Sequence, residues 1–90
     1  MKNISKQQYE ELKMLLDARI AKCRILKEEK ELFILNNILD NSKEDELKLA
    51  GDLISKLENM IAEYKDDMFA LFEKYNSQFA KSIPTSILNK

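Results

Sequence analysis

The fold is decided by residues 47–75, which read LKLAGDLISKLENMIAEYKDDMFALFEKY. Apolar side chains recur there at alternating spacings of three and four residues, which is a heptad pattern sustained over four repeats. Such a stripe predicts a long amphipathic helix that packs along another helix. The nine residues of this stripe are Leu47, Ala50, Ile54, Leu57, Ile61, Tyr64, Met68, Leu71 and Tyr75.

Four more apolar residues lie beside this stripe and widen it into a broad face: Leu53, Met60, Phe72 and Phe79. A contact between two helices needs only the a and d positions of the heptad. We therefore expect more apolar surface than one neighbouring helix covers. A surplus of this kind usually marks an interface.

Upstream of the stripe, Asp40-Asn41-Ser42 breaks the helical pattern. We expect Asn41 to adopt the left-handed conformation that ends one helix, and Ser42 to cap the next. The acidic residues 44–46 then suit the first turn of a helix, where the macrodipole favours negative charge. These signals predict an all-α, antiparallel two-helix hairpin of long helices, and a single bent helix is the alternative.

The first helix is expected to begin at a capping box formed by Ser5 and Gln8. Its apolar face lapses at residues 24–31, where charges dominate, and returns at 32–35 and 38–39. The apolar face before the lapse consists of Tyr9, Leu12, Leu16, Ile20 and Cys23.

The charged lapse has two interpretations. Lys27 and Lys30 either fix the register against Asp52 of the opposite helix, as buried polar residues do in some coiled coils, or belong to a solvated stretch.

The whole chain, residues 1–90, is interpreted as a single helical domain. The expected boundaries are a first helix at about 6–39, a turn at 40–42, a second helix at about 43–82 and a short tail at 83–90. The second helix should end before Pro84, because the residue before a proline disfavours the helical conformation. The apolar residues of the tail either fold back onto the helices or stay loose.

The composition argues against enzymatic activity. Histidine, the usual general acid or base near neutral pH, is absent, and no motif for a cofactor, metal or small-molecule substrate is present. The single cysteine, Cys23, lies on the apolar face of the first helix and is interpreted as a small core residue. No apolar stretch has the length of a signal sequence or membrane span. We expect a cytoplasmic protein without enzymatic activity.

The sequence therefore predicts a non-enzymatic protein–protein interaction module that presents a helical apolar face, as an adaptor, an inhibitor of the immunity type or an assembly subunit. Its partner is itself, as a homodimeric four-helix bundle, and/or another protein. Phe69 departs from the stripe and is expected to be exposed, although the aromatic end is also consistent with an ordinary core packed against Tyr9, Leu12 and Leu16. The candidate contact residues are Leu53, Leu57, Met60, Ile61, Tyr64, Met68, Phe69, Leu71, Phe72, Tyr75 and Phe79.

A second hypothesis is a nucleic-acid-associated helical dimer that uses the basic segment of the first helix. The net charge of −1 gives no overall attraction to phosphate, and the basic residues alternate with acidic ones. Salt distinguishes the two hypotheses, because phosphate contacts weaken steeply as salt rises. The basic residues are Lys13, Arg19, Lys22, Arg24, Lys27 and Lys30.

Overall fold

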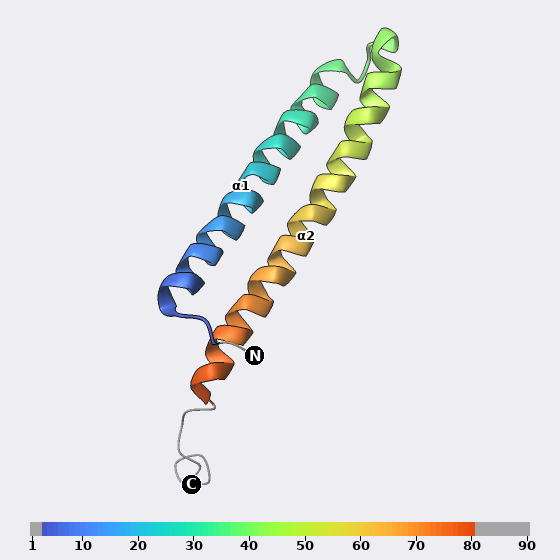
Figure 1. Ribbon diagram of the computed structural model, residues 1–90. Helices are drawn as coiled ribbons and strands as arrows, with labels where there is room; N and C mark the ends of the chain where they lie inside the picture. The colour runs from blue at the N-terminus through green and yellow to red at the C-terminus, as the bar shows by residue number, and fades with distance from the viewer. Residues whose placement is uncertain (1–2, 81–90) are drawn as a thin grey trace.

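The computed structural model describes residues 3–80, which form two long helices that pack side by side in opposite directions (Figure 1). Helix α1 spans Lys6–Asn37, the 3-10 turn η1 spans Asn41–Lys43, and helix α2 spans Glu44–Ala80. The prediction of an all-helical hairpin is confirmed, and the single bent helix is wrong. The expected end of the second helix before Pro84 and the tail at 83–90 lie outside the described residues.

The open end of the hairpin is held by local hydrogen bonds. The predicted capping box is confirmed, because the Ser5 hydroxyl accepts from the backbone N–H of Gln8 at 3.1 Å and the Gln8 side chain accepts from the backbone N–H of Ser5 at 2.9 Å. Gln78 of α2 reaches across to Ile4, accepting from its N–H at 3.0 Å and donating to its carbonyl at 2.7 Å. These bonds tie the start of α1 to the last turns of α2.

The connection between the helices differs from the prediction. Helix α1 ends at Asn37 rather than near residue 39, and the Asn37 side chain donates to the carbonyl of Phe33 at 2.8 Å. No residue in 3–80 has a positive φ, so Asn41 is not left-handed. The chain reverses instead through Asp40, whose backbone is extended, and the carboxylate of Asp40 rather than Ser42 caps the turn that leads into α2.

The predicted stripe of α2 is the seam of the hairpin. All nine of its residues are buried or half-buried. The buried side chains come from both helices: Ile20 (6% exposed), Cys23 (5%), Ala50 (4%) and Leu57 (9%). The assignment of Cys23 as a core residue is confirmed. The seam residues of α1 are Tyr9, Leu16, Ile20, Cys23, Lys27, Lys30, Ile34 and Asn37.

Two ring contacts help to fix how α1 lies along α2. The rings of Tyr9 and Tyr75 stack near the open end, with their centroids 4.3 Å apart. The guanidinium of Arg19 lies over the Tyr64 ring, 5.8 Å from its centroid. Both contacts join residues that are far apart in the sequence, so they specify the register of the two helices.

An ion pair occupies the middle of the seam, where Lys27 Nζ lies 3.7 Å from Glu58 Oε1. Lys27 and Lys30 are half-buried seam residues, whereas the other six residues of 24–31 are exposed, so each interpretation holds in part. The expected partner Asp52 is wrong, because the carboxylate that pairs with Lys27 is that of Glu58.

Replacing Leu57 by Ala should lower the free energy of unfolding by about 2–3 kcal/mol, because a buried side chain is lost and a cavity remains. Leu35→Ala is the matched control, since Leu35 is exposed and surface substitutions change stability by about 0.5 kcal/mol or less. Urea denaturation followed by circular dichroism measures both. Equal losses for the two variants would show that Leu57 is not at the centre of the seam.

The turn should make stability depend on pH. Hydrogen bonds to Asp40 from the Ser42 hydroxyl at 2.6 Å and from its backbone N–H at 3.0 Å lower the pKa of the Asp40 carboxyl, and the positive charge of Lys43 adds to the effect. Because the pKa of Asp40 is lower in the folded chain than in the unfolded chain, its ionised carboxylate stabilises the fold at pH values above the unfolded pKa of about 3.9. This stabilisation is lost as the pH falls through the folded pKa.

Asp40→Ala should therefore melt at a lower temperature than the wild type at pH 7, and the difference should shrink below about pH 4. Asp40→Asn is the control, because an amide still accepts the capping hydrogen bond but carries no charge. The gap between the Asn and Ala variants should not change with pH. Thermal melts from about pH 7 to pH 2.5 test this. A difference in melting temperature between the wild type and Asp40→Ala that does not change with pH would contradict it.

Candidate interaction surface

The structure divides the predicted contact residues into three groups. Leu53 and Met60 lie beside the seam on one face of the hairpin. Phe69, Phe72 and Phe79 lie towards the opposite face, where they are 64%, 53% and 48% exposed. The expected exposure of Phe69 is confirmed, and its contact with a partner stays a prediction. The other six residues lie in the seam against α1, buried or half-buried: Leu57, Ile61, Tyr64, Met68, Leu71 and Tyr75.

The face that carries Leu53 and Met60 also receives apolar residues from α1. When the seam residues of both helices are taken as positions a and d of the heptad, this face is formed by positions c and g of both. We call it the open face. Its large side chains remain half-buried or exposed, so the hairpin by itself does not cover them. They are Leu12, Leu15, Leu26 and Phe33 of α1, and Leu49, Leu53 and Met60 of α2.

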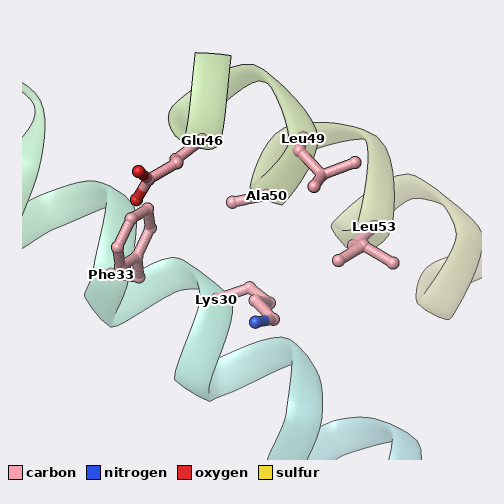
Figure 2. Close-up of a pocket in the computed structure, with 6 residues that line it drawn as sticks. All are labelled: Lys30, Phe33, Glu46, Leu49, Ala50 and Leu53. Atoms are coloured by element: carbon pink, nitrogen blue, oxygen red, sulfur yellow. The ribbon is translucent and has the colours of Figure 1, made fainter. Parts of the chain in front are cut away.

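Two hollows indent the open face, one towards each end of the hairpin. The hollow near the turn lies between the helices, where Phe33 and Lys30 of α1 face Ala50 and Leu53 of α2 (Figure 2). Glu46 and Leu49 complete its lining. The second hollow lies along the first turns of α1. It is lined by Ile4, Gln8, Glu11, Leu12 and Leu15.

Charged residues are interspersed among the apolar ones on the open face. Positions c and g of α1 hold Arg19, Lys22 and Glu29, and those of α2 hold charges of both signs. Hence the face is amphipathic rather than uniformly apolar, and its charges are spread along its length. The charged residues of α2 at these positions are Glu46, Lys56, Glu63, Asp67 and Lys74.

The contribution of α1 to this surface was missed by sequence analysis. Its spacing is visible in the sequence, since residues 12, 15, 19, 22, 26, 29, 33 and 36 alternate steps of three and four. However, Arg19, Lys22 and Glu29 occupy three of these positions and hide the pattern. The face predicted for α1 also included Leu12, which the structure places on the open face beside the seam with 43% of its surface exposed.

Neither a metal-binding cluster nor an exposed thiol is present among the described residues. No group of three or more Cys, Asp or Glu side chains within residues 3–80 is placed to hold a metal ion. The thiol of Cys23 is buried in the seam. Neither helix of the described chain has a stretch long and apolar enough to cross a membrane. The surface that stands out is therefore the open face.

Comparison with known proteins gives no match to any family model, curated protein or solved structure. The open face must accordingly be interpreted from its own residues.

Phe69→Asp should leave the fold intact, with a change of about 0.5 kcal/mol or less in the free energy of unfolding, because the ring is mostly exposed. Tyr75→Asp, at an aromatic position in the same helix, should instead lower stability by about 2 kcal/mol or more, because it removes the stacking on Tyr9 and places a charge in the seam. Urea denaturation measures both. A large loss for Phe69→Asp would place that ring in the core.

Proposed function

We propose that this chain is a non-enzymatic protein–protein interaction module that works by presenting the open face of its helical hairpin to another helical surface. The single observation that carries this proposal is the imbalance between buried and exposed apolar side chains. Four residues of the described chain are buried, whereas fourteen large apolar side chains are exposed. Five of these fourteen lie on the open face, together with the half-buried Phe33 and Leu53. Monomeric proteins rarely leave large contiguous apolar patches uncovered.

Self-association into a homodimeric four-helix bundle is the simplest way to cover this face. A second hairpin of the same sequence brings the same length and the same heptad spacing, and cyclic dimers are the commonest oligomers. A different protein with an amphipathic helix is the other partner class. In that case the chain acts as an adaptor, an inhibitor or an assembly subunit, and a cytoplasmic location suits each of these roles.

The nucleic-acid alternative is disfavoured by how the basic residues of α1 are used. Lys27 pairs with Glu58 and Lys30 is half-buried in the seam, while Arg19 lies over the Tyr64 ring. Three of the six basic side chains named for this role thus turn towards α2. A row of cations that follows a phosphate backbone should lie exposed on one side.

Oxidation of methionine tests the proposal within the natural sequence. Met60 lies on the open face and is 40% exposed, whereas Met14 lies elsewhere on α1 and is 69% exposed. Peroxide oxidises exposed methionine to the sulfoxide, so a partner on the open face should slow the reaction of Met60 and not that of Met14. We expect the ratio of the Met60 rate to the Met14 rate, measured by peptide mass spectrometry, to fall severalfold as the chain is concentrated.

The outcomes separate the partner classes. Protection of Met60 in the concentrated purified chain supports self-association. Protection that arises only when an extract of the native host is added supports a different partner protein. A constant ratio under all these conditions would contradict the proposed function.

A further inference from the structure

We propose that the partner of the open face is a second copy of this chain, packed face to face with both turns at the same end of the bundle. In this arrangement α1 of each copy lies on α2 of the other. The inference rests on the proposed function and specifies its partner and geometry. The observation behind it is a pattern of opposite charges that have no ionic partner within the hairpin itself.

The register of the hairpin determines which residues lie at the same height. A residue of α1 and a residue of α2 are level when they lie at the same height along the hairpin. Tyr9 stacks on Tyr75, so the numbers of two level residues add up to 84 there, and the ion pair of Lys27 with Glu58 gives a sum of 85. A twofold axis parallel to the helices keeps every residue at its own height. It therefore places each residue of α1 opposite the residue of α2 in the second copy for which the two numbers add up to about 85.

Opposite charges meet at these heights. Four acid–base pairs satisfy the rule, three at positions c and g and one at the edge of the face. Because the residue numbers of every pair add up to 85 or 86, one docking arrangement brings all four together. By symmetry, the dimer contains each pair twice. The pairs are Arg19 with Asp67, Lys22 with Glu63, Glu29 with Lys56 and, at the edge, Glu11 with Lys74.

The hairpin does not close these pairs by itself. Within residues 3–80 the ion pairs are Lys27–Glu58 in the seam and Lys43–Glu46 in the first turn of α2. Arg19 contacts the Tyr64 ring but remains exposed. The charges of all four pairs can thus form ion pairs with another molecule. Complementary charges of this kind determine the partner and the register more than the affinity.

Apolar residues match at the same heights. Leu26 lies level with Met60 of the second copy, and Phe33 lies level with Leu53. The second pair lies at the hollow near the turn, which the second copy would fill. A face about 45 Å long and two helices wide, or about 20 Å, buries about 900 Å² per copy. A stable interface needs about 800 Å² per partner.

The reverse arrangement, with the turns at opposite ends, is less complementary. It places α1 on α1 and α2 on α2. The twofold axis then runs perpendicular to the helices, at the level of Arg24 and Met60. It also brings opposite charges level, namely Arg19 with Glu29, Lys56 with Glu63 and Glu46 with Lys74. However, Lys22 then meets Leu26 of the second copy, and Asp67 meets Leu53. Both charges would be desolvated without a partner, which is unfavourable. The arrangement with both turns at one end pairs Lys22 with Glu63 and Asp67 with Arg19, so it leaves fewer charges of the open face unmatched.

Two charge reversals test the arrangement. Lys22→Glu and Glu63→Lys each turn the attractive contacts of these two positions into repulsive ones in their own homodimers. Each variant should dimerise about tenfold more weakly than the wild type or worse. In an equimolar mixture the two variants form a heterodimer in which each contact between positions 22 and 63 again joins one acidic and one basic side chain. Its dissociation constant should return to within about threefold of the wild-type value.

Analytical ultracentrifugation measures the dissociation constants, and circular dichroism checks that each variant folds. Lys65→Glu is the control, because Lys65 is exposed on the opposite face and its reversal should leave dimerisation unchanged. A mixture no tighter than the separate folded variants would overturn the arrangement. A monomeric wild type whose Met60 is protected only in host extract would overturn this inference while leaving the proposed function standing.

Discussion

The narrowness of a seam between two helices is the constraint on which the rest of this structure depends. Each helix contributes only its a and d positions to that seam, and in this chain Lys27 and Lys30 occupy two of those positions on α1. A core this small leaves fourteen large apolar side chains of the described residues exposed. The only buried residues of the described chain are Ile20, Cys23, Ala50 and Leu57.

The sequence predicts α2 well because its pattern is continuous. All nine residues assigned to its stripe are in the seam, and the capping box at Ser5 and Gln8 is where the pattern indicates. The turn is less predictable, because Asp40 and Ser42 can both cap a helix and nothing local decides between them. In the structure, Asp40 is the residue that caps.

The surface of α1 is hard to predict from sequence for a related reason. Its apolar residues lie on nearly every side of the helix, so no single stripe stands out. Only the position of α2 shows that Leu12, Leu26 and Phe33 belong to one face and that Lys27 belongs to the seam. This lysine is half-buried, and its ammonium group meets the exposed Glu58. The half of the surface contributed by α1 therefore required the structure.

Light scattering on the purified full chain is the most direct test of whether a second copy of the chain covers the open face. We predict a molar mass near twice that of the 10.6 kDa chain, falling towards the monomer value on dilution. A mass of 10.6 kDa at every concentration, with the helices fully formed, would contradict self-association through this face.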